Sequence, residues 1–387
     1  MQLQLAQRSF VEAQPVRRVA SLDALRGFSM FWIVGADGAV LALEQMSAGK
    51  GAFLNNFGHL LGNQFRHVAW EGFRFYDFIF PLFIFVTGVS IVFSLTRLVE
   101  RQGITKIHIR VLRRALLLFG LGLIYYGGIS RHWHDIRLLG VLQRIALCYL
   151  FASLLFLNFN LRGMLLVFAS LLLGYWALMT FVPVPGMGAG SFGPDANLAN
   201  WIDAHYLPGR LWDHTRDPEG MLSTLPAIGT CLLGVFAGLL LKDDRLKAQQ
   251  KALALIGIGI IMVPVGYLWG LQFPVIKPIW TSSFVLVAGG YSFFLLGVWY
   301  QIIDVWAFRR WSIIFVWIGA NAITLYFLNN VFGFEPFAQR FVGGDFSVLL
   351  DELVTLGTGR FVTHVLGLLF AIALAGFLYR RKIFLRV

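Results

Sequence analysis

Long apolar runs recur along the whole chain, and they restrict its fold more than any other feature. About twenty apolar residues in a helix span the hydrocarbon core of a bilayer. We predict ten such spans, at residues 22–43, 76–97, 111–129, 138–158, 163–182, 221–241, 252–271, 280–303, 311–333 and 359–379. The runs are continuous rather than alternating, which favours helices over a barrel, because lipid forces each segment to satisfy its own backbone hydrogen bonds. The predicted fold is all-α, a polytopic membrane protein.

Composition excludes a soluble globular chain. Hydrophobic residues make up 58% of the sequence and charged residues 13%, whereas soluble proteins average about half and about a quarter. The first twenty residues are polar, and no small-residue cleavage site follows the first apolar run. We therefore expect that run to be an uncleaved helix rather than a signal peptide.

The basic residues predict the orientation. They are about twice as frequent in the loops on the side of the N-terminus as on the opposite side, which predicts that both termini are cytoplasmic. The net charge of +12 then lies beside the membrane, where it fixes topology and meets anionic lipid. This pattern argues against a nucleic-acid partner. A bacterial-type inner membrane and an organelle membrane fit it equally well.

The chain is expected to form one helical domain over residues 1–387, with a cytoplasmic segment at 1–20. The main external segments are predicted at 44–75, 183–220 and 334–358. The two cysteines, Cys148 and Cys231, fall inside predicted spans, so neither a disulfide framework nor a metal site is implied.

Charged residues inside the predicted spans are candidate functional groups, because they are costly in lipid. Asp23 and Arg26 are three residues apart and can pair on one helix face; they could equally contact a charged ligand. Asp37 lies further along the same helix, near the external side, without a basic neighbour. Arg144 is its candidate partner, and either a structural pair or a catalytic role suits Asp37.

The segment "FRHVAWEGFRFYDFIFPLFIFVTG" places His67 on the same external side as Asp37. A histidine there is either an amphipathic anchor at the interface or a proton acceptor, since imidazole titrates near neutral pH. Trp70 flanks it, and Asp77 opens the helix that follows. His132 and His134 are competitors for the same role. A third donor for a metal is not identifiable.

Several stretches together resemble the heparan-α-glucosaminide N-acetyltransferase family of transmembrane acyltransferases. They are "RRVASLDALRG", "HVAWEGFRFYDFIFPLFIFVTG", "GVLQRIALCYL", "DPEGMLSTLPAIGTCLLGVFAG" and, more weakly, "WTSSFVLVAGGYSFF". The resemblance implies a transmembrane acyltransferase fold that moves an acetyl group from cytosolic acetyl-coenzyme A to the amine, or a hydroxyl, of a sugar across the membrane. It implies a bacterial-type member without the large luminal domain, and a homodimer surrounded by lipid.

The family's catalytic histidine falls on His67, which would act as general base or as a transient acyl carrier. This sequence departs from the family pattern in two ways: Asp37 stands where lysosomal members have an asparagine, and the segment between Asp37 and His67 is an insertion. Because of both departures, the resemblance does not determine the identity of the acceptor. Candidate residues for the coenzyme are Arg17, Arg18, Ser21, Asp23, Arg26, Arg113 and Arg114. Candidate residues for the substrate or for support are Trp70, Asp77, Gln143, Arg144, Asp217 and Glu219.

Two other functions remain open at this point. Buried charges, together with Pro81 and Pro264 inside spans, also suit a permease for a sugar or amino sugar. A lipid-binding scaffold leaves Asp37 and Arg144 unexplained. The family motifs around a single external histidine favour the enzyme, because a transporter does not need them.

Overall fold

The computed structural model describes residues 19–102, 104–130 and 132–385, and this part of the chain contains helices but no named strand. Within it, eight helical stretches are long and apolar enough to cross a membrane. They are α1 to α2 (Ala20–Ser47), α4 (Phe75–Gln102), α6 (Val141–Asn158), α7 (Leu161–Phe181), α9 (Thr224–Lys242), α10 (Ala248–Gly270), α11 with its π-helical end (Ser282–Val305) and α16 (Thr358–Arg380). The prediction of a polytopic all-α membrane protein is confirmed, and the predicted ends lie within a few residues of these helices.

The other two predicted spans take different forms. The span at 311–333 is a pair, Arg310–Ala320 and α13 (Ala322–Val331), bent by 65°, which would make a ninth span; α12 (Ile313–Ala320) forms most of its first arm. The span at 111–129 corresponds to α5 (Ile104–Tyr125), whose first half carries Lys106, Arg110, Arg113 and Arg114. α5 therefore begins as a basic helix and is not among the helices apolar enough to cross a membrane, so the described residues contain eight or nine candidate spans rather than the ten predicted.

Three helices form the centre of the molecule. α4 and α9 are each 78% buried along their apolar windows, and α11 is 72% buried, whereas α7 and α10 are 22% buried and face outwards. Glycines let α4 and α9 touch: a Cβ on Gly234 would lie 1.9 Å from the carbonyl oxygen of Phe85. This close packing fixes the central helices that carry the site residues described below.

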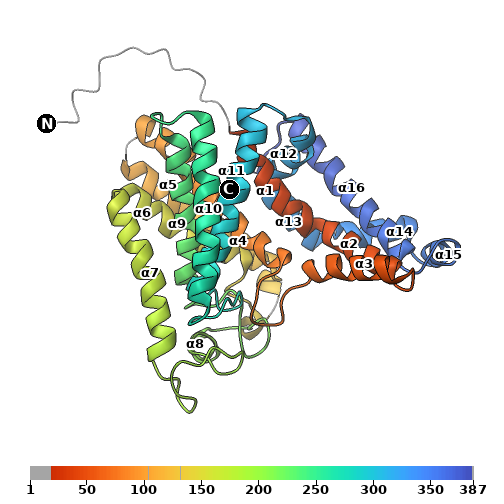
Figure 1. Ribbon diagram of the computed structural model, residues 1–387, viewed down its shortest axis with the longest axis horizontal. Coiled ribbons are helices and arrows are strands. Elements are labelled where there is room, and N and C mark those ends of the chain that lie inside the picture. Colours follow the sequence, from red (N-terminus) through yellow and green to blue (C-terminus); the bar gives the residue numbers. More distant parts are fainter. Residues whose placement is uncertain (1–18, 103, 131, 386–387) are drawn as a thin grey trace.

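The first span bends near its middle. Gly35 has a φ of 135°, within a π-helical turn (Trp32–Ala36) that separates α1 (Ala20–Phe31) from α2 (Asp37–Ser47). Glycine adopts this backbone conformation at little cost. As a result α2 leaves the central bundle and joins a lateral arm, seen on the right of Figure 1. The arm also contains α3 (Ala52–Gln64), α14 (Phe334–Val342), α15 (Asp345–Leu353) and one end of α16.

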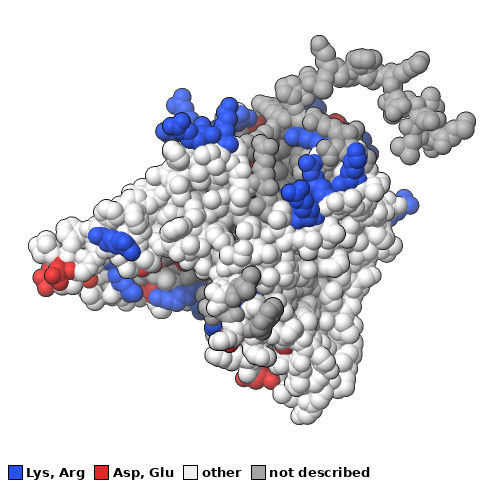
Figure 2. Space-filling view, turned by 180° about the vertical axis from the view of Figure 1, so that it is seen from behind, with Lys and Arg blue, Asp and Glu red and all other residues white. Residues whose placement is uncertain are grey.

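The charged side chains are distributed unequally between the two ends of the spans. Lys and Arg side chains gather at one end and also occur along the arm, and most visible Asp and Glu side chains lie towards the other end and at the tip of the arm (Figure 2). The first end carries the loops after α4, α9 and α11, and the opposite end carries α8 (Leu198–Tyr206). We refer to them as the basic end and the opposite end.

Candidate active site

The predicted histidine and carboxylate meet in one hydrogen-bonded pair. His67 Nδ1 lies 2.7 Å from Asp77 Oδ1. The histidine side chain is 55% exposed, whereas the aspartate side chain is only 2% exposed. A buried carboxylate therefore holds an imidazole whose other edge faces outwards, which is the arrangement of a positioned general base.

Asp77 is held by the loop that precedes its own helix. Its Oδ2 accepts hydrogen bonds from the backbone N–H groups of Val68 and Arg74, each at 3.2 Å. Asp77 lies in the first turn of α4, where the unpaired N–H groups of a helix favour negative charge. The guanidinium of Arg74 also donates to the carbonyl of His67, at 3.2 Å. These bonds fix the ten-residue loop that brings His67 back over Asp77.

A lysine that was not predicted completes the pair. Lys277 lies between α10 and α11, and its Nζ is 3.3 Å from Asp77 Oδ1 and 3.1 Å from His67 Nδ1. Its strand-like segment is joined to the histidine loop by a hydrogen bond from Gly72 N–H to Val275 O at 2.8 Å. Burial lowers the pKa of the Lys277 ammonium, and the neighbouring Asp77 carboxylate opposes that change.

This cluster indicates which nitrogen of His67 is free to react. A carboxylate can only accept hydrogen bonds, so the 2.7 Å contact requires a proton on Nδ1. Asp77 Oδ1 then accepts from both His67 and Lys277. Nε2 is left as the unprotonated nitrogen of the neutral ring, available to take a proton or an acyl group.

Asp37 reaches this cluster through a tyrosine. Tyr76 donates its hydroxyl hydrogen to Asp37 Oδ2 at 2.7 Å, and its ring lies 4.8 Å from the imidazole of His67, centroid to centroid. The predicted pairing of Asp37 with Arg144 is wrong. Arg144 instead donates to the carbonyl of Gly220 and the hydroxyl of Ser223, because the segment before α9 packs over its helix.

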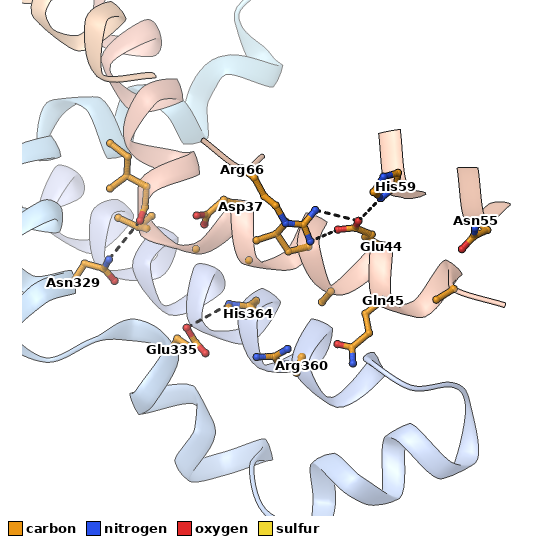
Figure 3. A pocket seen from close by; sticks show the side chains of 17 residues that line it. Asp37, Glu44, Gln45, Asn55, His59, Arg66, Asn329, Glu335, Arg360 and His364 are labelled. Carbon is orange, nitrogen blue, oxygen red and sulfur yellow. Dashed lines mark hydrogen bonds and ion pairs between the residues drawn. The ribbon is translucent and has the colours of Figure 1, made fainter. Parts of the chain in front are cut away.

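Asp37 lies in the wall of a cavity of about 990 Å³ at the base of the arm, which we call the mixed-charge cavity. Its walls come from α2, α3, α13, α14 and α16. Its charged and titratable residues, all labelled in Figure 3, are Asp37, Glu44, His59, Arg66, Glu335, Arg360 and His364. A cavity of this size and polarity suits a sugar with charged groups.

The mixed-charge cavity has two ion-pair groups in its wall. Glu44 binds Arg66 at 2.6 Å and His59 at 3.0 Å. On the other side, Nδ1 of His364 lies 3.7 Å from Glu335 Oε2, and the histidine ring packs so tightly on Gly38 that a Cβ there would lie 2.4 Å from it. His364, Glu335 and Arg360 were not predicted, because nothing local in the sequence joins α14 and α16 to Asp37.

A second cavity, of about 710 Å³, opens among basic residues, and we call it the basic cavity. Arg26, Arg113 and Arg114, all predicted to bind the coenzyme, line it together with Lys106 and Arg110. Arg26 donates to Ser90 at 2.7 Å and pairs with Asp23 at 3.4 Å, so the predicted Asp23–Arg26 pair is present. Several guanidinium groups around one hollow suit a ligand with phosphate groups.

The remaining residues predicted for the coenzyme are placed as follows. Ser21 is buried at the start of α1, where its backbone N–H donates to the Asp304 carboxylate at 3.1 Å. Its side chain therefore faces the protein interior rather than the basic cavity. Arg17 and Arg18 lie outside the described residues.

A small apolar cavity of about 20 Å³ lies between the two larger ones. It shares Phe83, Ile145 and Ile323 with the basic cavity, and Ile33 with the mixed-charge cavity. The three cavities are therefore neighbours that share wall residues, with the small apolar one in the middle; His67 lines none of them, and Asp37 with its partner Tyr76 links the mixed-charge cavity to the histidine.

The other predicted residues form a separate cluster at the opposite end. Arg137, which was not predicted, binds Asp217 and Glu219, each at 2.6 Å. Although burial opposes it, the hydrogen bond to Asp217 raises the pKa of the Arg137 guanidinium. Gln143 is fully buried against Gly122. This cluster joins the loop before α6 to the segment before α9, and it supports the fold beside the site.

Trp70 joins the histidine loop to the segment between α7 and α8. Its indole N–H donates to the carbonyl of Phe192 at 2.8 Å, and the Arg216 guanidinium lies 5.3 Å from the centre of its ring. His132 and His134, the competitors of His67, are both exposed. Within the described residues, no group of three His, Cys, Asp or Glu side chains is arranged to hold a metal ion.

Comparison with known proteins bears directly on this arrangement. Residues 18–266 match the family model described as heparan-alpha-glucosaminide N-acetyltransferase, catalytic. The chain belongs to this family. It is 29% identical over 388 residues to the human protein named heparan-alpha-glucosaminide N-acetyltransferase, and 27% identical over 384 residues to the mouse protein of that name. Each match covers 84% of this chain and 56% of the relative, so the chain spans about half the length of these relatives.

The family match divides the site into two parts. His67, Asp77, Asp37 and the arginines of the basic cavity lie inside residues 18–266. Lys277 and the wall contributed by α13, α14 and α16 lie beyond that range. The mixed-charge cavity is therefore built partly by residues that the family model does not describe.

Proposed function

We propose that the protein is a membrane-embedded acetyltransferase, with acetyl-coenzyme A as donor and an amino sugar as acceptor. The donor's phosphates would bind at the basic end, and the acetyl group would pass to the acceptor's amine at the opposite end. The names of the relatives supply the reaction class, N-acetyl transfer to a glucosaminide. The order of the three cavities supplies the geometry.

That order is the observation on which the proposal depends. Arg26, Arg113 and Arg114 offer cations to the phosphates. The small apolar cavity between the two larger ones has room for about one water molecule, so it excludes phosphate groups and would widen to pass a neutral thioester arm. Beyond it lies a cavity lined by Asp37 and other polar groups. A single-sided enzyme would have no use for such a sequence of environments.

The orientation follows from the distribution of charge. Basic residues concentrate on the cytoplasmic side of membrane proteins, so we place the basic end (Figure 2) in the cytoplasm together with both termini. His67 and the mixed-charge cavity then face the external side. A bacterial inner membrane, in which acetyl-coenzyme A is available only from the cytoplasm, suits this arrangement.

His67 is proposed to handle the proton or the acyl group. In direct transfer, Nε2 takes the proton of the acceptor amine as the amine attacks the thioester carbonyl. The C–N bond forms, the C–S bond breaks, and the proton passes to the departing thiolate. In the two-step alternative, Nε2 attacks the thioester carbonyl, the C–S bond breaks and the thiolate departs; the amine then attacks the acetyl group on Nε2, the C–Nε2 bond breaks, and the amine's proton passes to the thiolate. Asp77 orients the ring in both. Asp37 would hold the acceptor's ammonium group, which loses one proton to water to give the amine that attacks.

The decisive experiment combines product analysis with one substitution. Purified protein in lipid nanodiscs is incubated with acetyl-coenzyme A and glucosamine, and the N-acetylated sugar is measured by mass spectrometry. His67→Ala should nearly abolish product, while His132→Ala and His134→Ala, as matched controls, should retain most activity. Loss of a general base costs a factor of about 10² to 10⁴ in rate.

The same experiment tests the rival function. Cavities at both ends of one route also suit a transporter for an amino sugar. If no amino sugar is acetylated, but proteoliposomes take up labelled glucosamine in a manner that His67→Ala abolishes, the protein is a transporter and the proposed reaction is wrong.

A further inference from the structure

The second helix of the arm, α3, is amphipathic without being charged. α3 contains no Asp, Glu, Lys or Arg among its thirteen residues. Its glycines lie on α2, since a Cβ on Gly58 would collide with Ser47. Its large side chains face away from the protein: Phe53 is 80% exposed, Leu60 is 61% exposed, and the ring of Phe57 stacks parallel to that of Phe53 at 6.4 Å.

The opposite wall of the mixed-charge cavity has the same character. On α14, Phe337 and Phe341 are largely exposed, and both rings pack within 6 Å of Phe370 on the membrane span α16. Leu369, next to Phe370, is 54% exposed on that span. The apolar surface of α14 is therefore continuous with the lipid-facing surface of a transmembrane helix. An apolar surface continuous with a span is covered by lipid rather than by water.

The polar sides of these helices form the entrance to the cavity. Asn55 and His59 of α3, Glu335 of α14 and Arg360 of α16 are all exposed and all line the mixed-charge cavity. Polar groups on one side of a helix and large apolar groups on the other are typical of helices that lie in the membrane interface. The entrance therefore lies where lipid tails end and head groups begin.

We infer that the acceptor is an amphiphile, an amino sugar attached to a hydrocarbon tail, which enters the cavity sideways from the membrane. This inference rests on the proposed function. The sugar would occupy the mixed-charge cavity, with its ammonium group at Asp37. The tail would remain in the outer leaflet, along the exposed Phe53 and Phe57 of α3. A water-soluble sugar would have no contact with this apolar rim.

The test compares two acceptors that differ only in the tail: methyl and dodecyl 2-amino-2-deoxy-β-D-glucopyranoside, with the protein in nanodiscs. The measured quantity is the ratio of kcat/KM for the dodecyl compound to that for the methyl compound. The dodecyl tail partitions into the bilayer by itself and so changes the ratio without any contact with the protein. The effect of the protein is therefore read from the difference in this ratio between variants. In Phe53→Gln/Phe57→Gln it should fall at least about tenfold, because two apolar contacts are lost.

The matched control changes lipid-facing residues far from the cavity. Leu166→Gln/Leu173→Gln alters two exposed leucines of the outer helix α7 and should leave the ratio unchanged. An equal ratio in the wild type, the α3 variant and the control overturns the inference, while acetylation of the methyl compound still supports the proposed function. A change from dimer to monomer in the α3 variant, with the ratio unchanged, assigns α3 to a subunit interface. Acetylation of neither compound rejects the proposed function itself.

Discussion

Replacing Asp77 by Asn tests the role of the carboxylate without changing its size. Asp77 accepts four hydrogen bonds: from His67, from Lys277 and from the backbone N–H groups of Val68 and Arg74. An asparagine has one accepting oxygen and one donating nitrogen. If its oxygen keeps the two backbone donors, its nitrogen faces His67. The ring must then accept at Nδ1, which places the proton on Nε2, where the reaction needs a free lone pair.

The expected loss can be estimated from this change of tautomer. Removing a general base costs a factor of about 10² to 10⁴, which corresponds to about 3 to 5.5 kcal/mol in the activation free energy. In Ser-His-Asp triads the same substitution lowers kcat about 10⁴-fold for the same reason. Because Asp77 is 2% exposed, water cannot easily replace the lost acceptor. We therefore expect Asp77→Asn to lie near the upper end of the range.

Stability must be separated from catalysis in this experiment. Asp77→Asn leaves the Lys277 ammonium, whose side chain is 19% exposed, without its carboxylate, and breaking a buried pair costs about 3–5 kcal/mol. Asp77→Asn/Lys277→Met removes both charges and should recover stability without recovering activity. The assay measures release of free coenzyme A thiol together with acetylated glucosamine, on protein that elutes as one peak in size-exclusion chromatography. If Asp77→Asn retains at least a third of wild-type kcat while His67→Ala is inactive, Asp77 does not set the tautomer.

Three further predictions concern ligand binding, pH and topology. Arg113→Ala/Arg114→Ala should weaken coenzyme A binding at least about tenfold in calorimetry. Binding by the wild type should also weaken with salt, because ions screen the phosphates. An unchanged affinity of the double variant for coenzyme A would remove both residues from the site. Burial raises the pKa of Asp203 to about 7 from its ordinary value of 3.8, so the folded state keeps a proton that the unfolded chain releases. The melting temperature in detergent should therefore fall as pH rises from about 4 to 7, and Asp203→Asn should flatten this dependence; an equal slope in both proteins would contradict the assignment. Ser191→Cys should react with a membrane-impermeant thiol reagent added outside, whereas Gln249→Cys should not. The reverse labelling pattern would show that the proposed orientation is inverted.

The spans were predictable because lipid imposes one simple requirement on each of them. A run at 221–241, for example, appears as α9 (Thr224–Lys242), since about twenty apolar residues suffice to specify a crossing. α5 was harder to predict from hydropathy, because its arginines face a cavity that only the folded helices create. A sequence window cannot distinguish a basic helix that borders a cavity from a basic loop.

The site was predictable only where its members are close in the sequence. His67 and Asp77 are ten residues apart, and the family motifs marked both. Lys277 lies 200 residues from Asp77, and a lone lysine in a short segment between two spans carries no local signal. The error in pairing Asp37 with Arg144 has the same origin: both lie on one side of the membrane, yet Tyr76 is the nearer partner. Membrane depth can be inferred from the sequence, but the angular position of each helix around the bundle cannot.

The narrow apolar cavity also has an electrical consequence. Moving one elementary charge through a membrane potential of 100 mV changes its free energy by about 2.3 kcal/mol, so a coenzyme that crossed with its phosphates would couple the reaction strongly to voltage. On the proposed reaction, a cavity of about 20 Å³ lined by Met30, Phe80 and similar side chains would keep those phosphates at the basic end. Only the uncharged thioester arm would reach across, and the amine's proton would return with it as a thiol. On the proposed reaction, acetyl transfer is electroneutral, so it should run equally fast in proteoliposomes with and without an imposed potential.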